Sequence, residues 1–205
     1  MWSTSTACRS FATSAGWLLL IAVLGAQTPG PDRSWRLQET PAELRPAVSR
    51  AELIVLSMQS ELLRELTSAL ARGGPELAVQ SCHVDVVGII QRIGQQEGVA
   101  AGRTSDRLRN SANAPRRWAA PLVMEYAGRP ARTMDGFVVD LGSRIGVLKP
   151  IAHQPMCASC HGPADRMDAS VRAVIAGRYP RDQATGFVDG ETRGWFWVEV
   201  PKGLR

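Results

Sequence analysis

Apolar residues recur at three- and four-residue steps over residues 46–71, a spacing that is typical of one face of a helix. The next stretch, ARGGPE (residues 71–76), joins glycines that end a helix to a proline that suits the first turn of another. A second helix is predicted from there to about Gln96. Its apolar stripe consists of Ala78, Cys82, Val86, Ile89 and Ile93. The pattern therefore predicts two helices joined by a sharp turn.

Strand-like patterns come later in the chain. Residues 138–141 and 145–148 are short apolar runs around a Gly-Ser turn, and WFWVEV (residues 195–200) is predicted as a last strand. Between helices and strands, residues 98–117 are expected to form an ordered arginine-rich loop, and residues 118–126 a short helix. Three methionines are expected to fill the core: Met58, Met124 and Met134. Helices followed by strands, without βαβ alternation, predict an α+β domain in which N-terminal helices pack on an antiparallel sheet.

Composition agrees with a single folded domain. The chain has 205 residues, of which 44% are hydrophobic and 21% charged. We expect the domain to span residues 46–205, after a polar, flexible lead-in over residues 27–45. The formal net charge is +5, but the basic residues are scattered and form no run. Nucleic acid is therefore not an expected partner.

The first 26 residues have the features of a secretory signal peptide. Arg9 precedes the apolar run WLLLIAVLGA (residues 17–26), which is too short to span a bilayer, and small residues suit cleavage near Gly25 or Ala26. A retained anchor helix is the alternative. We therefore expect a periplasmic or otherwise exported protein. Its mature chain keeps three cysteines, so at least one has no partner for a disulfide.

The heptapeptide MCASCHG (residues 156–162) contains the spacing CxxCH. A c-type haem is attached when two thiols, two residues apart, add to its vinyl groups, and the following histidine binds the iron. Structural zinc would need a second pair of ligands, which the sequence lacks, and a thioredoxin-like pair belongs in a βαβ unit. The motif therefore predicts one covalent haem c, with Cys157 and Cys160 as anchors and His161 as the proximal ligand.

The ligand on the opposite side of the iron decides what such a haem does. Cys82 and His83 are neighbours on the second predicted helix, and both border apolar positions. His153 is close to the attachment motif in sequence, so it would need an awkward chain reversal to reach the opposite face. The residues alone leave Cys82 and His83 as equal candidates, and a core position for both remains an alternative.

Several separated stretches resemble a known family. LAVQSCHVDV, GRTSDRLRNSANAP, CASCHGP and the closing G-WFWVEVP are similar, in this order, to exported single-haem c-type proteins first described as a domain of unknown function. The resemblance covers about residues 53–201. It implies a PAS-like fold and ligation of the iron by a cysteine, here Cys82, together with His161. Four residues of the arginine-rich loop are candidates to bind the haem propionates or to hold the loop: Arg103, Arg109, Asn110 and Asn113.

Two classes of function follow from these expectations. The resemblance implies a haem-based sensor of redox state or of a small gaseous ligand such as CO or NO. A periplasmic electron carrier is the alternative, and an enzymatic activity such as peroxidase is a weaker one. The sequence has no kinase or other transmitter segment, so a separate redox or signalling partner protein is expected.

Overall fold

The computed structural model describes Met1 and residues 33–203, except the side chains of residues 82–85. Residues 2–26 of the predicted signal peptide therefore lie outside the described residues. The described part of the expected lead-in is ordered: Ser34–Arg36 form the strand β1, and the single turns η1 (Leu37–Glu39) and η2 (Ala42–Leu44) follow. The sequence pattern does not predict this strand, because three residues are too few to show an alternation.

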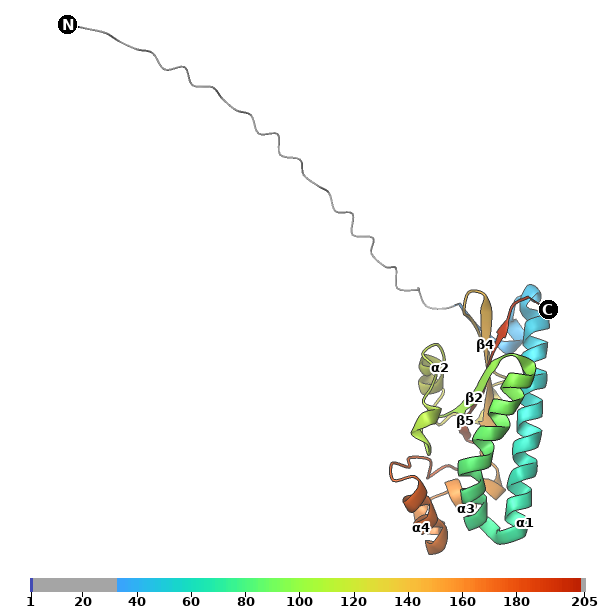
Figure 1. The fold of residues 1–205 in the computed structure, drawn as a ribbon, viewed down its shortest axis with the longest axis vertical. Helices are drawn as coiled ribbons and strands as arrows, with labels where there is room; N and C mark the ends of the chain where they lie inside the picture. Colours follow the sequence, from blue (N-terminus) through green and yellow to red (C-terminus); the bar gives the residue numbers. More distant parts are fainter. Residues whose placement is uncertain (2–32, 204–205) are drawn as a thin grey trace. The chain divides into compact units, whose positions relative to one another are not determined.

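Helix α1 (Arg45–Glu97) is interrupted by a sharp reversal of the chain. Gly73 and Gly74 have non-helical backbone angles, and Gly74 adopts φ 67° and ψ −164°, a region open essentially to glycine alone. The second half of α1 returns beside the first half towards the sheet (Figure 1). The two predicted helices and the turn at ARGGPE are confirmed. Ala78, Val86 and Ile93 of the predicted stripe are buried.

Five antiparallel strands form one sheet in the order β1-β3-β4-β5-β2. Its other members are β2 (Ala100–Thr104), β3 (Phe137–Asp140), β4 (Arg144–Ala152) and β5 (Thr192–Pro201). The predicted α+β class is confirmed. The segment 98–117, expected to be a loop, contains β2, whose short AAGRT sequence has no apolar alternation of its own.

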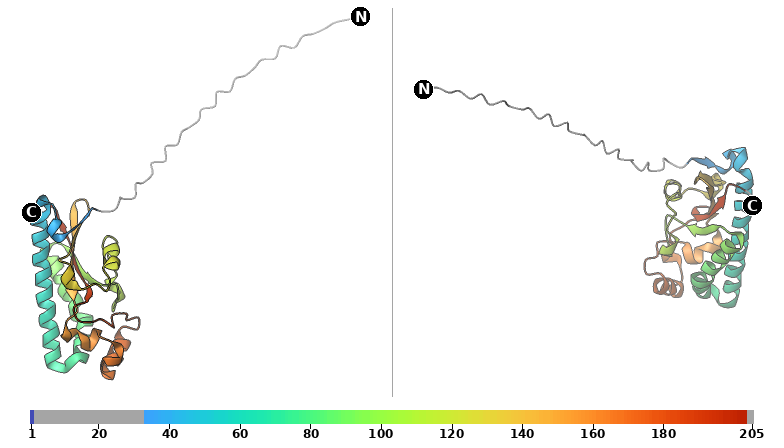
Figure 2. Two further views of the ribbon diagram at one scale, coloured as in Figure 1. Left: turned by 180° about the vertical axis from the view of Figure 1, so that it is seen from behind. Right: turned by 45° about the horizontal axis from the view of Figure 1, so that its top comes forward.

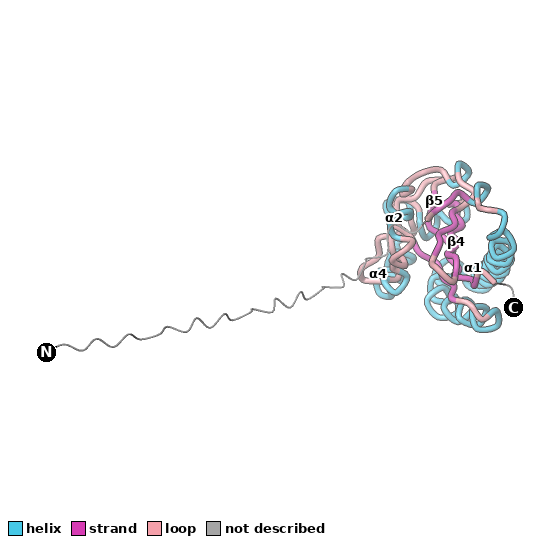
Figure 3. Tube along the Cα trace, turned by 90° about the horizontal axis from the view of Figure 1, so that it is seen from above, coloured by secondary structure: helices cyan, strands magenta, loops and turns pink. Residues whose placement is uncertain are grey.

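The strands alternate between two packed faces, as the period of two requires. Val138, Val147 and Val198 are cross-strand neighbours that pack against the first half of α1. Phe137 and Leu148 point to the opposite face, where they pack with Val123. The strands consequently lie between α1 and α2 (Ala120–Glu125), which is visible from above in Figure 3 and from two further directions in Figure 2.

Short elements complete the fold between β2 and β3 and between β4 and β5. These are η3 (Ser111–Asn113), η4 (Ala131–Thr133), η5 (Pro155–Cys157), α3 (Ala158–His161), η6 (Ala164–Arg166) and α4 (Ala169–Arg178). Helices α3 and α4 lie beside the turn between the two halves of α1 (Figure 1). In the part of the chain that the structure describes, no helix is both long and apolar enough to cross a membrane.

The expectation for the three methionines is partly wrong. Met58 and Met134 are buried as predicted, but 63% of Met124 is exposed. Helix α2 buries Val123 against the sheet, and the next residue along a helix points about 100° away from it. Met124 therefore points away from the core that Val123 enters.

Candidate functional site

The CxxCH motif forms one helical turn, residues 157–161, which we call the attachment turn after the role expected from the sequence. Cys157 ends η5, and Cys160 and His161 belong to α3. Residues three apart on a helix share a face, so the two thiols of Cys157 and Cys160 are presented on the same side. The structure joins neither in a disulfide. Gly162 ends the turn so tightly that a Cβ there would lie 2.7 Å from the carbonyl oxygen of Ala158.

The imidazole of His161 is oriented by a backbone carbonyl. Its Nδ1 lies 2.9 Å from the oxygen of Ala184, an acceptor, so Nδ1 carries the proton and donates it. Burial of the ring lowers the pKa of His161 well below its ordinary value, and the positive charges of Arg193, Arg109 and Arg103 lower it further. His161 is therefore a neutral imidazole whose Nε2 keeps its lone pair, the form in which histidine binds a metal.

Arg109 joins three segments around this histidine. Its guanidinium lies 3.2 Å from both carboxylate oxygens of Asp182 and 3.2 Å from the carbonyl oxygen of Ala184. It also donates to the carbonyl of Cys160. Both side chains of the Arg109–Asp182 pair are largely buried. The loop after β2 is thus held to the attachment turn and to the segment after α4.

The other three loop candidates have different surroundings. The side chain of Asn110 accepts a hydrogen bond from the N–H of Ala112, 3.0 Å away, and so caps η3. The backbone oxygen of Asn113 accepts from the hydroxyl of Thr104 at 2.8 Å. Arg103 lies on β2 opposite Phe196, on the α1 face of the sheet. Asn110 and the backbone of Asn113 hold the loop, and Arg103 contributes charge near His161.

Residues 182–191 pass behind His161, and we call this segment the strap. The N–H groups of Gly186 and Phe187 donate to the carbonyls of Gly162 and His161, at 2.8 and 3.1 Å. The ring of Phe187 meets the imidazole of His161 edge-on, with 6.3 Å between centroids. The strap therefore fixes the histidine through two backbone hydrogen bonds, one aromatic contact and the carbonyl of Ala184.

Arg107 holds the strap from the other side. Its guanidinium lies 3.5 Å from the centre of the Phe187 ring, and it donates to the carbonyl of Thr185 and pairs with Glu191. No sequence pattern distinguishes Arg107 from the other arginines of its loop. Only the chain's return after α4 brings Phe187 and Glu191 to it.

His153 is buried next to the strap. It is 2% exposed, its Nδ1 lies 3.1 Å from a carboxylate oxygen of Asp189, and its Nε2 has no hydrogen-bond partner among the described residues. Its ring stacks on Phe187 with 6.1 Å between centroids. Phe187 thus contacts both histidine rings.

The attachment turn lies close to the second half of α1. Cys160 packs against a small apolar cluster that joins α1 to α4 and consists of Val79, Met167, Val171, Ile175 and Tyr179. Cys82 and His83 follow Val79 by one turn of the same helix, but their side chains lie outside the described residues.

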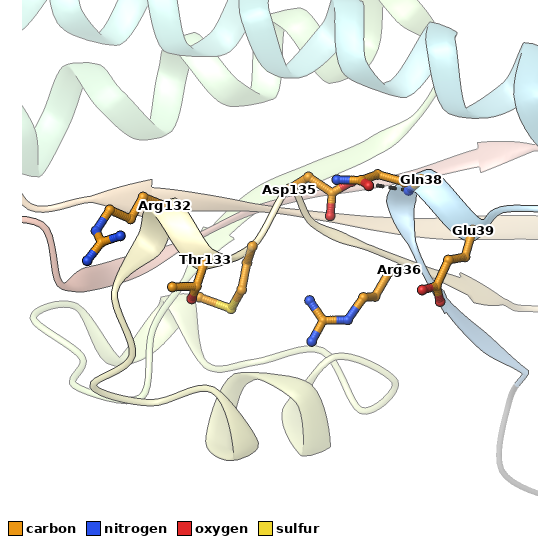
Figure 4. A pocket seen from close by; sticks show the side chains of 7 residues that line it. Arg36, Gln38, Glu39, Arg132, Thr133 and Asp135 are labelled. Atoms are coloured by element: carbon orange, nitrogen blue, oxygen red, sulfur yellow. Dashed lines mark hydrogen bonds between the residues drawn. The ribbon is translucent and has the colours of Figure 1, made fainter.

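A polar pocket opens at the other edge of the sheet. Arg36, Gln38, Glu39, Arg132, Thr133, Met134 and Asp135 line it. Figure 4 shows the N–H of Gln38 donating to Asp135, at 3.1 Å. This pocket lies at the β1–β3 edge, whereas Arg103 and the loop that follows it belong to the β2 edge. It contains none of the residues that surround His161.

A family model identifies the family of this chain, and a solved structure resembles its fold. The family model described as Tll0287-like matches residues 38–201. The solved structure of a cyanobacterial heme-protein, Tll0287, is similar in fold, with a TM-score of 0.55 and 24% sequence identity. The match covers 81% of this chain and 99% of that chain. None of the curated proteins compared matches significantly.

Proposed function

Because the chain belongs to the Tll0287-like family, we propose that it is a haem-binding protein in which Cys157 and Cys160 carry one haem c and His161 binds its iron. The similar solved structure is that of a heme-protein, which supports a haem here. The observation that carries the proposal is the state of His161. A neutral imidazole with Nδ1 bonded to Ala184 and Nε2 available is the arrangement a metal-binding histidine requires.

The surrounding residues fit this cofactor. Two thiols on one face of a turn provide the paired attachment that a c-type haem needs, and Gly162 lets the chain turn away directly after His161. A haem held there supplies a one-electron iron couple. Arg109 and the strap fix the proximal imidazole, and Arg103, Asn110 and Asn113 are proposed to lie near the propionates. The arginine charges around His161 favour the reduced iron electrostatically.

Cys82 is proposed as the ligand on the opposite face. A thiolate is a strong electron donor, so it stabilises ferric iron and lowers the reduction potential, in opposition to the arginines. Reduction of the iron would weaken the bond between the iron and this thiolate, because added electron density on the iron opposes an anionic donor. We propose that this redox-dependent ligation makes the protein a sensor of redox state or of a small ligand that takes the released position. The protein would be exported, and its signal would pass to a separate partner protein.

An electron carrier is the second candidate. It is favoured by the rigid proximal side, because few atoms need to move when a firmly held ligand set accepts an electron. A sensor should bind CO or NO after reduction and change its redox state slowly, whereas a carrier should cycle quickly without ligand exchange. Stopped-flow reduction with and without CO distinguishes them.

The test of the haem begins with purified protein from a host that attaches haem c. A pyridine haemochrome spectrum should show one covalent haem per chain, and Cys157→Ala with Cys160→Ala should abolish it. Ser159→Ala, which lies between the two cysteines, is the matched control and should leave attachment intact. Cys82→Ser should shift the ferric Soret band and raise the potential, and His83→Gln should do neither. A chain without covalent haem would sink the proposal, and an unchanged spectrum in Cys82→Ser would remove that ligand.

A further inference from the structure

The pair His153–Asp189 is a buried titratable group that the proposed haem site does not use. His153 is almost completely enclosed, yet its Nε2 has no hydrogen-bond partner among the described residues. A buried polar nitrogen without a partner is costly in a folded protein. Its other nitrogen contacts Asp189, whose side chain is 61% exposed. The pair thus connects an enclosed imidazole to solvent through one carboxylate.

This pair is electrostatically close to His161. Phe187 contacts both imidazoles and is 1% exposed, so its ring, and not water, lies at both contacts. The two imidazole centroids are therefore at most about 12 Å apart, because 6.1 and 6.3 Å separate each from the Phe187 centroid. Charges interact much more strongly through a buried apolar side chain than through water. A charge gained at His153 is consequently felt at a metal bound to His161.

Three charged side chains face the His153–Phe187 pair. Asp189 contacts the imidazole of His153, and Arg107 lies on the ring of Phe187. Glu191 pairs with Arg107, and its backbone oxygen accepts a hydrogen bond from the N–H of His153 at 2.8 Å. Two carboxylates and one guanidinium thus leave a net negative charge beside the two rings. Reduction of the iron would add a further negative charge, and an added negative charge favours uptake of a proton nearby.

We propose that His153 is a proton-binding site coupled to reduction of the iron, an inference that rests on the proposed haem. When a one-electron donor in solution reduces ferric to ferrous iron, Nε2 of His153 takes up a proton from solvent. The electron and the proton together leave the charge of this region unchanged. Asp189 stabilises the resulting imidazolium through Nδ1–H.

The coupling predicts how the reduction potential depends on pH. Within the window where only the reduced protein holds the proton, the equilibrium constant for reduction falls by up to about tenfold per pH unit, or about 59 mV. Outside that window His153 is in the same protonation state before and after reduction, so it adds no pH dependence to the potential. His153→Gln should remove this part of the dependence. Asp189→Asn should move the window to lower pH, because the imidazolium loses its anionic partner.

The experiment is a redox titration of the haem-loaded protein at several pH values, with proton uptake on reduction measured in weakly buffered solution. Asp165→Asn is the matched control: it removes an exposed carboxylate near the attachment turn but does not touch the strap. It should keep the wild-type slope and proton uptake. Because His153 is buried, Asp189→Asn at the exposed end tests the idea if His153→Gln fails to fold.

The outcomes distinguish this inference from the proposed function. A loaded protein whose slope and proton uptake are the same in wild type, His153→Gln and Asp189→Asn overturns the inference and leaves the haem in place. With His153→Gln unfolded, an Asp189→Asn window that does not move also overturns it. A chain that never carries haem overturns the proposed function itself.

Discussion

At the scale of single residues, the side chains that position His161 are mostly ones whose partners are distant in sequence. Arg109 is the clearest case, since it bonds Asp182 and two backbone carbonyls from two other segments. The Arg109–Asp182 pair is mostly buried, so removal of either partner leaves a charge with neither water nor a counter-ion. An arginine in such a position contributes much more to the free energy of unfolding than an arginine at the surface does.

Arg109→Gln is therefore expected to destabilise the protein by about 3–5 kcal/mol, the range for a broken buried pair. Urea unfolding followed by circular dichroism measures this change. Arg92→Gln is the control, because Arg92 pairs with Glu61 at the surface of α1 and its loss should change little. Equal changes in the free energy of unfolding for the two substitutions would show that the Arg109 network stabilises the protein no more than a surface ion pair does.

At this scale the sequence predicts the candidate chemistry, but not the residues that surround it. A fixed spacing of two cysteines and a histidine predicts a haem-attachment motif without knowledge of the fold. Arg107, Phe187 and Asp189 have no such spacing, and their roles depend on how the strap returns to the sheet. A pattern within one segment cannot predict partners that tertiary structure alone brings together.

At the scale of elements, the close packing of β2 on β5 depends on one pair of residues, a glycine and a tryptophan that face each other across the two strands. Gly102 on β2 pairs with Trp197 on β5, and a Cβ at Gly102 would lie 2.4 Å from the Trp197 indole. The indole therefore lies across the place where a side chain would be. The same packing explains why β2 was missed: its glycine makes room for a neighbour and adds nothing to an apolar alternation.

Gly102→Ala is expected to cost about 1–3 kcal/mol of stability, because the indole or the strand must shift. Gly177→Ala in α4 should do the opposite, since nothing lies within 4 Å of its missing Cβ. Alanine in a helix is favoured over glycine by about 0.5–1 kcal/mol. Thermal unfolding of both variants tests the pair, and a Gly102→Ala protein as stable as wild type would contradict this packing.

At the scale of the whole molecule, the apolar core has separate parts. The two clusters on the faces of the sheet include no buried residue from 153–191. The third cluster joins Val79 of α1 to α4 and includes Cys160 at its border. The helical hairpin and the α+β class were predictable, because long apolar periods reflect the two sheet-facing clusters. Helix α4 was not, since its burial is confined to this small third cluster.

This division predicts how the protein behaves without its haem. In the Cys157→Ala, Cys160→Ala protein, hydrogen exchange should remain slow in β3, β4 and β5, because the sheet clusters are complete. Exchange should become faster in α3, α4 and the strap, which surround the proposed haem site. Mass spectrometry of peptides from both forms measures this difference. A uniform loss of protection would show that the parts unfold as one unit.

The bond from His161 to Ala184 ends on a backbone oxygen, and this has a consequence for protein engineering. No exchange of one side chain for another can delete that acceptor, so ordinary mutational scanning at position 184 would report size and shape only. The acceptor can still be weakened chemically, by replacing the following residue, Thr185, with its α-hydroxy acid. The resulting ester carbonyl is a poorer acceptor than an amide, and the exchange also removes the N–H of Thr185, which donates to the carbonyl of Gln183 at 3.0 Å. The combined loss sets an upper bound on how strongly this peptide oxygen governs the histidine.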